Sequence, residues 1–211
     1  MNAIIRQVDH LVYAAPDLLA GIDEVESLLG IAAIMGGSHP QWGTANALLS
    51  LGDDVYLEVI GPDPEQPEFS GERAFGIDGL SAPKLVTWAA NTADIDSVCT
   101  IELAPGQTLG TAFPASREQT DGSMLHWRLT NPMLNLADGL VPFFIDWGRS
   151  PHPSQNTPRG ASLLNLAFEH PDTAQTERML QTLGFDVTVQ TAERPALLAV
   201  IEGHNGEVEL R

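Results

Sequence analysis

The hydrophobic and polar positions of this chain repeat one arrangement, twice clearly and once faintly. Residues 8–30 hold an extended apolar stretch, then a Pro-Asp pair, then apolar positions at helical spacing that end in Leu-Gly. Residues 163–185 follow the same order, and residues 84–103 follow it more weakly, with Asp94 in the place of Asp17. A chain that repeats a strand–helix unit is expected to pack its copies together around a shared concavity.

Each copy predicts a strand, a helix and then further strands. In the first copy, residues 7–14 have the composition of a strand, and Asp17 is placed to cap a helix that stops at Gly30. Residues 45–51 and 55–60 are two apolar runs joined by a Gly-Asp-Asp turn, which predicts a hairpin. The unit is therefore expected to have the order β-α-β-β-β.

The remaining chain fits two more units of this order. In the second unit, the strand, the helix and three further strands are expected at residues 85–90, 93–103, 110–118, 123–130 and 142–147. Pro- and Gly-rich connections lie at residues 61–83 and 149–160, and the third unit ends in β-like runs at 196–202 and 207–210. We predict an α+β fold with a domain at residues 1–150, made of units at about 7–60 and 84–148, and a third unit at 161–211.

Composition excludes several classes of partner. The 211 residues carry 10 Lys and Arg against 28 Asp and Glu, a formal charge of −18, which disfavours nucleic acid and anionic membrane surfaces. No apolar run is long enough to span a membrane, and the N-terminus does not resemble a secretory signal. Cys99 is the single cysteine, so no internal disulfide can form, and we expect a reducing, cytoplasmic location.

The span 36–60 contains the motifs Gly-Gly-x-His-Pro, Gly-Thr-x-Asn and Tyr-Leu-Glu, and residues 142–147 are PFFIDW. These motifs resemble the glyoxalase-like domain group of the vicinal-oxygen-chelate superfamily over residues 7–148. The resemblance implies that each β-α-β-β-β unit curls into half of a barrel, that two units close a curved mixed sheet around one site, and that a small molecule binds there.

The resemblance also implies metal ligands on the first and last strands of each unit. Carried over, these are His10 and Glu58, with Asp146 as a third ligand if Phe-Ile-Asp is placed on Tyr-Leu-Glu. Zn, Ni, Mn or Fe would suit such a set. Strand alternation supports an inward His10, with Asp9 on the opposite face. The second unit offers only Thr87 or Trp88 where another ligand would stand, so the fourth position stays open.

Other polar residues are candidates for substrate binding. The resemblance places His39, Thr44 and Asn46 at the cavity mouth. On the strand at 123–130, either His126 and Arg128 or Trp127 faces the cavity, because successive side chains point to opposite sides. Arg128 is either a carboxylate anchor or a surface charge, and Trp147 is expected in the cavity wall.

Two functions of different classes remain open. The first is a divalent-metal-dependent lyase or isomerase on a small oxygen-bearing substrate, with Glu58 or Asp146 as the catalytic proton shuttle. The second is a metal-free protein that sequesters a small molecule. The third unit, with Asn165 and Glu209 at the positions of His10 and Glu58, either packs on the first two or mediates a homodimer.

Overall fold

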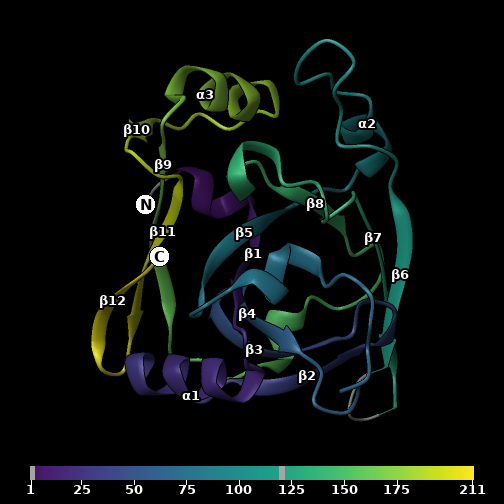
Figure 1. Cartoon of the computed structure of the whole chain (residues 1–211), viewed down its shortest axis with the longest axis vertical. Helices are drawn as coiled ribbons and strands as arrows, with labels where there is room; N and C mark the ends of the chain where they lie inside the picture. Colours follow the sequence, from purple (N-terminus) through teal and green to yellow (C-terminus); the bar gives the residue numbers. More distant parts are fainter. Residues whose placement is uncertain (1–2, 119–121) are drawn as a thin grey trace.

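The computed structural model describes residues 3–118 and 122–211. It contains two sheets, one of eight strands and one of four (Figure 1). The eight-stranded sheet is built by the first two β-α-β-β-β units, and the four-stranded sheet by the C-terminal segment. The mixed α+β class expected from the sequence is confirmed.

The first unit has the order that the hydrophobic pattern predicted. Its elements are β1 (Val8–Ala14), α1 (Leu18–Leu29), β2 (Ile34–His39), β3 (Thr44–Gly52) and β4 (Val55–Pro62). The side chain of Asp17 accepts a hydrogen bond from the backbone N–H of Ala20, which caps α1. Gly30 ends the helix with φ of 70°, a left-handed conformation that glycine adopts without steric cost.

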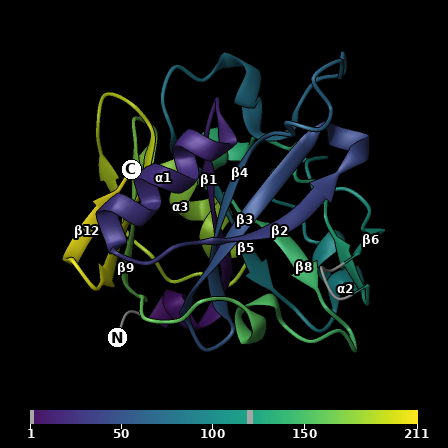
Figure 2. The same ribbon diagram turned by 90° about the horizontal axis from the view of Figure 1, so that it is seen from below.

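The second unit repeats this topology. Its elements are β5 (Lys84–Asn91), α2 (Ile95–Cys99), β6 (Phe113–Glu118), β7 (Met124–Leu129) and β8 (Phe143–Asp146). The strand order is β2-β3-β4-β1-β5-β8-β7-β6, with β1 parallel to β4, β5 parallel to β8, and β1 antiparallel to β5 at the centre. The edge strands β2 and β6 contact each other, so the sheet curves into a nearly closed barrel (Figure 2). Short 3-10 helices lie at Ala3–Gln7, Pro40–Trp42, Ala74–Gly79, Leu136–Gly139 and Pro153–Asn156.

The C-terminal segment has the same succession of elements but a different pairing. Its elements are β9 (Ser162–His170), α3 (Thr173–Thr182), β10 (Val189–Thr191), β11 (Ala196–Gly203) and β12 (Gly206–Leu210), in the sheet order β10-β9-β11-β12. The first strand β9 is parallel to β10, which directly follows the helix, whereas β1 and β5 are parallel to the last strand of their units. This segment therefore forms a separate sheet and not a third half-barrel of the same pairing.

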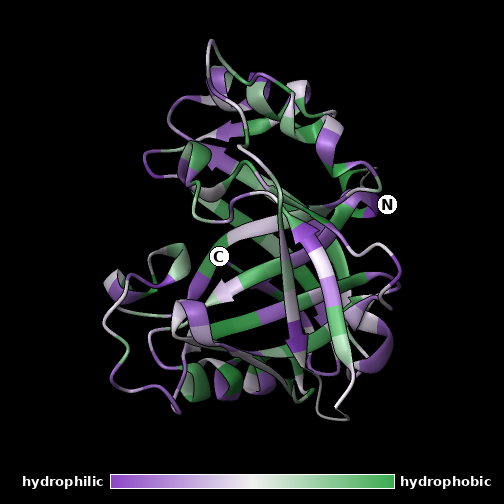
Figure 3. Ribbon diagram, turned by 90° about the vertical axis from the view of Figure 1, so that its right-hand side faces the viewer, coloured by the Kyte–Doolittle hydropathy of each residue, from purple (hydrophilic) through white to green (hydrophobic). Residues whose placement is uncertain are grey.

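The four-stranded sheet packs against the convex face of the barrel. Trp88 of β5 is fully buried, and its ring centroid lies 5.9 Å from that of Phe168 on β9 and 5.0 Å from that of Phe185. Hydrophobic side chains from both sheets belong to one core. Hydrophobic and hydrophilic residues follow one another along the strands that face the viewer in Figure 3. Residues 161–211 thus pack on the first two units, and their part in a homodimer stays a prediction.

A second, smaller core lies on the concave face. Val12 and Ala14 of β1 belong to it, because alternation along the strand turns them inward together with His10. The concave face is thus apolar except at a few positions, and those positions form the site described below. Among the residues that the structure describes, no helix is long and apolar enough to cross a membrane.

Candidate functional site

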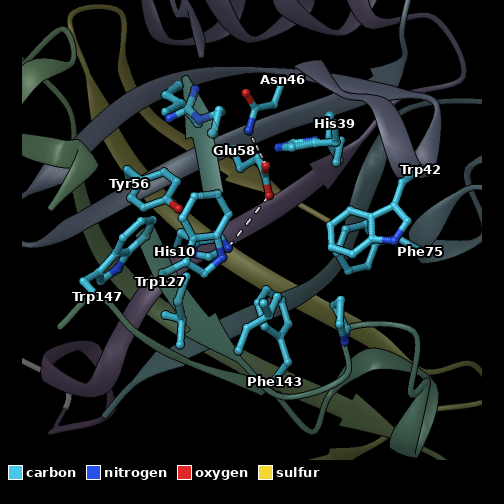
Figure 4. Close-up of a pocket in the computed structure, with 16 residues that line it drawn as sticks. His10, His39, Trp42, Asn46, Tyr56, Glu58, Phe75, Trp127, Phe143 and Trp147 are labelled. Atoms are coloured by element: carbon cyan, nitrogen blue, oxygen red, sulfur yellow. Dashed lines mark hydrogen bonds and ion pairs between the residues drawn. The ribbon is translucent and has the colours of Figure 1, made fainter. Parts of the chain in front are cut away.

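A small cavity of about 60 Å³ lies inside the barrel. Aromatic and aliphatic side chains form most of its wall, and Figure 4 shows them surrounding a polar group at its centre. The polar residues that line the cavity are His10, His39, Asn46, Glu58 and Arg117. The apolar ones include Trp42, Phe75, Trp127, Phe143, Ile145 and Trp147.

His10 lies between two carboxylates. Its side chain is almost fully buried, its Nδ1 lies 2.7 Å from Oδ1 of Asp9, and its Nε2 lies 3.8 Å from Oε2 of Glu58. The ring stacks on Tyr56, with the ring centroids 4.6 Å apart. An ionised carboxylate only accepts hydrogen bonds, so we assign the proton of the neutral ring to Nδ1. The lone pair on Nε2 then points toward Glu58.

Asp9 is a fully buried acceptor for three donors. Besides the His10 ring, Nε1 of Trp147 donates to its Oδ2 at 2.8 Å, and Nε2 of His152 lies 3.3 Å from the same oxygen. Burial alone would raise the pKa of Asp9, but the hydrogen bonds from His10 and His152 outweigh it and lower the pKa below the usual value. Asp9 is therefore a buried carboxylate that stays ionised.

The position of Asp9 corrects the expectation that it lies on the opposite face from His10. The pairing of β1 with β5 shifts register between Val8 and His10. Such an irregularity interrupts strict alternation, so neighbouring side chains can meet on one side of a strand. The sequence gives no local sign of this shift.

Glu58 is held by Asn46 of the neighbouring strand β3. The Nδ2 of Asn46 donates to Oε1 of Glu58 at 2.5 Å, which leaves the second oxygen of the carboxylate directed at His10. Because the carboxylate accepts, the amide nitrogen of Asn46 must face it. The amide oxygen Oδ1 is then left buried with no hydrogen-bond partner among the described residues.

His39 and Thr44 lie beside this pair. The Nδ1 of His39 is 3.2 Å from Oγ1 of Thr44, and both side chains are buried. Burial lowers the pKa of His39, and Arg117 lowers it further, whereas Glu58 raises it. The ring lines the cavity, as expected from the sequence, but Thr44 lies behind His39 and does not line the cavity.

The structure does not bring Asp146 to His10 and Glu58. Phe143, Ile145 and Trp147 line the cavity, so alternation along β8 turns Asp146 away from it. Its Oδ1 instead accepts a hydrogen bond from the backbone of Gly148 at 2.9 Å.

The strand register explains this misplacement. Asp17 and Asp94 cap the equivalent helices of the two units, so they are equivalent positions. Val12 and Ala89 are separated by the same number of residues and are therefore also equivalent. Glu58 pairs with Val12, and Phe143 pairs with Ala89. Phe143, and not Asp146, therefore stands in the second unit where Glu58 stands in the first. By the same offset, Thr87 stands where His10 does.

Arg128 also lies outside the cavity. Its guanidinium forms two hydrogen bonds to Asp96, at 2.7 and 2.9 Å, on the outer side of β7. Trp127 is the residue of this strand that faces inward. Of the two possibilities expected for this strand, Trp127 faces the cavity, and His126 and Arg128 do not line it.

The donor set does not fit the three-ligand metal site expected from the resemblance. Within residues 3–118 and 122–211, no three His, Cys, Asp or Glu side chains converge as metal ligands require. Of the three expected ligands, His10 and Glu58 approach each other, and the equivalent positions of the second unit hold Thr87 and Phe143. Catalytic zinc sites, by comparison, use three protein ligands and an open position.

Sequence reasoning missed Arg117. It lies on β6, lines the cavity with only 9% of its surface exposed, and its Nη1 has no hydrogen-bond partner among the described residues. Its side chain crosses the seam of the barrel and lies against Gly36 and Gly37 of β2. The Gly-Gly pair of the motif at residues 36–40 is the sign in the sequence that a large side chain packs there.

Comparisons with known proteins agree with this architecture. The sequence profile of the glyoxalase-like domain matches residues 8–194. The chain belongs to the glyoxalase-like domain family. The resemblance to the vicinal-oxygen-chelate superfamily is confirmed with it.

Solved structures are similar at low sequence identity. A hypothetical protein from Staphylococcus aureus shares the fold, with a TM-score of 0.64 and 16% identity over 96% of this chain and 83% of that one. Methylmalonyl-CoA epimerase from Mycobacterium tuberculosis has a TM-score of 0.43 and 18% identity over 71% of this chain and 91% of that one. A Streptomyces coelicolor methylmalonyl-CoA epimerase in complex with 2-nitronate-propionyl-CoA has a TM-score of 0.45 and 18% identity over 66% of this chain and 96% of that one. The comparison with curated proteins found no match.

Proposed function

We propose that this glyoxalase-like protein catalyses proton transfer at a carbon atom next to an oxygenated group of a compact substrate, the chemistry of isomerases and lyases. The observation that supports this most directly is the placement of His10 between Asp9 and Glu58 inside an apolar cavity. Such a pairing of acid–base groups with a buried orienting carboxylate is the arrangement that proton transfer needs.

His10 is the proposed base. Asp9 accepts from Nδ1, which fixes the tautomer and leaves Nε2 free to take a proton from a bound molecule. The ionised Asp9 also stabilises the imidazolium that forms when Nε2 is protonated. Stacking on Tyr56 and the edge contact of Phe143 hold the ring plane in place.

Glu58 is the proposed second group. One of its oxygens is held by Asn46, and the other faces both His10 and the cavity. It can receive the proton that His10 removes or deliver one to the opposite end of the substrate. Two titratable groups with different surroundings are a common basis for separate acid and base roles.

The size of the cavity limits the substrate. A volume of about 60 Å³ is well below the 300–1,000 Å³ typical of drug-sized ligand pockets. The part of the substrate that enters is therefore a few heavy atoms across. The aromatic walls keep water away from the reacting atoms and strengthen the electrostatic interactions between His10 and Glu58.

The proposal differs from the divalent-metal chemistry implied by the resemblance, because two ligands converge where three were expected. We accordingly propose that the reaction proceeds with the residues of the chain alone. Removal of metal ions by a chelator distinguishes the two mechanisms, since a metal-dependent enzyme loses its activity and this one retains it.

The test is deuterium exchange into 2-oxobutanoate in D₂O, followed by ¹H NMR at C3. The chelated protein should accelerate exchange of one of the two C3 protons, because a fixed base attacks one face. His10→Gln and Glu58→Gln should each reduce the rate by about 10²–10⁴-fold. Asp146→Asn is the matched control, since its carboxylate faces away from the cavity, and it should retain the parent rate.

Exchange that is equal in the parent and in His10→Gln would overturn the proposal. Exchange that vanishes on chelation and returns with added Zn²⁺ or Mn²⁺ would support the metal-dependent alternative. Thermal stabilisation by 2-oxobutanoate with no exchange would support the second function, a metal-free sequestering protein, which the predominantly apolar cavity wall also suits. A cytoplasmic location and a homodimer stay predictions, and light scattering checks the second.

A further inference from the structure

The Nη1 atom of Arg117 is buried in the cavity wall and has no hydrogen-bond partner among the described residues. No described carboxylate lies within salt-bridge distance of it, and Glu58 attracts it only at longer range. A buried charge is costly unless it is paired and hydrogen-bonded, so an unpaired one inside a cavity indicates a ligand of opposite charge.

A second unpaired atom lies next to it. A methyl group placed on Gly36 would clash with Oδ1 of Asn46 and lie 2.7 Å from Nη1 of Arg117, so both atoms pack against this glycine. Neither has a hydrogen-bond partner among the described residues. One is an acceptor and the other a donor, and both belong to residues that line the cavity.

We propose that Arg117 and Asn46 form a subsite for a carboxylate with a hydroxyl group on the adjacent carbon. The carboxylate accepts from Nη1 of Arg117, and the hydroxyl donates to Oδ1 of Asn46. This arrangement occurs in 2-hydroxy acids and in the enol form of 2-oxo acids. A neutral ligand would leave the guanidinium unpaired, and a ligand without the hydroxyl would leave Oδ1 unpaired.

The subsite deepens the proposed function, on which it rests for its place in the reaction. Asn46 contacts Glu58 through Nδ2 and would contact the ligand hydroxyl through Oδ1. The carbon that carries the hydroxyl is thereby held beside the carboxylate of Glu58. Arg117 is accordingly a specificity-determining residue, and it sets which end of the substrate enters the barrel.

The two glycines of β2 position Arg117. Gly37 has φ of 147°, and a Cβ there would lie 2.9 Å from Cδ of Arg117. A side chain at either glycine would displace the arginine from the seam between β2 and β6. The guanidinium of Arg117 therefore keeps its position only while β2 and β6 lie side by side and the barrel is closed.

The test compares three probes of similar shape by isothermal titration calorimetry: 2-hydroxybutanoate, its neutral amide 2-hydroxybutanamide, and butanoate. The parent protein should bind 2-hydroxybutanoate about tenfold or more tightly than either other probe, since the amide loses the charge that pairs with Arg117 and butanoate loses the hydrogen bond to Asn46. Arg117→Gln should abolish the preference over the amide, and Arg117→Lys should keep part of it. Arg128→Gln, which removes a cation outside the cavity, should bind as the parent does.

Equal affinity of the parent for the acid and the amide would overturn the proposal, as would the absence of binding by any probe at millimolar concentration. The same holds if a folded Arg117→Gln keeps the parent preference. If that variant does not fold, the three-probe comparison on the parent still decides. Binding without exchange would leave the subsite supported and the proposed function refuted, so the two failures are distinguishable.

Discussion

The carboxylate of Asp9 accepts a hydrogen bond from the ring of His10, at 2.7 Å, although the two residues are adjacent on one strand. In a regular strand such neighbours point to opposite faces, and the register shift after Val8 is what lets them meet. The same carboxylate also accepts from Trp147 and His152, which follow β8. One irregularity in β1 therefore links the ring of His10 to the residues that follow β8 in the second unit.

We predict that Asp9→Asn destabilises the protein and disables His10. An asparagine cannot accept from all three donors, and its own N–H₂ group would face one of them. Breaking a buried charged network of this kind costs about 3–5 kcal/mol. Urea denaturation measures the loss, and ¹⁵N NMR of the imidazole should show a changed tautomer.

Asp146→Asn is the matched control for this prediction. Its side chain accepts one hydrogen bond from a neighbouring backbone N–H, and it is partly exposed. Its free energy of unfolding should change by less than about 1 kcal/mol. If both variants lose the same stability, Asp9 does not have the structural role assigned here.

His39 should make stability depend on pH below neutrality. Burial is the main reason why its pKa in the folded state lies below the usual value of about 6.5. Between the two values the unfolded chain binds a proton that the folded chain does not, so stability is full above about pH 6.5 and falls as pH decreases. The expected slope in that window is about 1.4 kcal/mol per pH unit.

Replacement of His39 by glutamine removes this titration. The free energy of unfolding, measured by urea denaturation at pH 7.0, 6.0 and 5.0, should fall less steeply for the variant than for the parent. An unchanged slope would mean that His39 is protonated in the folded protein and that another group causes the decline.

The C-terminal sheet is predicted to be required for the stability of the barrel. Phe168 is fully buried against Trp88 at the contact between the two sheets. Phe168→Ala should cost about 3–5 kcal/mol, the usual loss for a buried phenylalanine. Leu164→Ala on the same strand is the control, because this leucine is exposed and should matter little. Similar losses for the two would show that the segment is not packed as described.

Local patterns were sufficient to predict the helices and most strands. Asp17, Asp94 and Asp172 each cap a helix, and each is recognisable because a short polar acceptor precedes helically spaced apolar residues. Four of the residues that line the cavity were also predicted, because strand alternation and the family motifs can be recognised within a short stretch of sequence. They are His10, Glu58, His39 and Asn46. The turn between β3 and β4 was predicted for the same reason.

The parts that could not be predicted depend on contacts between distant strands. The register of β8 against β5 decides that Phe143 takes the place of Glu58, and no nearby residue specifies that register. Arg117 reaches the site because β2 and β6 meet when the sheet curves. These are consequences of closing the barrel, and a pattern of apolar and polar positions along one strand does not contain them.

Asn46→Asp should disturb the position of Glu58. The amide nitrogen that now donates to Glu58 at 2.5 Å would be replaced by a second carboxyl group, and two like charges this close repel each other. The variant should lose about 1–3 kcal/mol of unfolding free energy, because a buried hydrogen bond is replaced by an unfavourable contact, and urea denaturation measures the loss. Exchange into 2-oxobutanoate should also slow, because the carboxylate of Glu58 is no longer held toward His10. Asn156→Asp adds the same charge at an exposed position and should leave stability and exchange unchanged, and a loss of equal size there would point to net charge instead of contact.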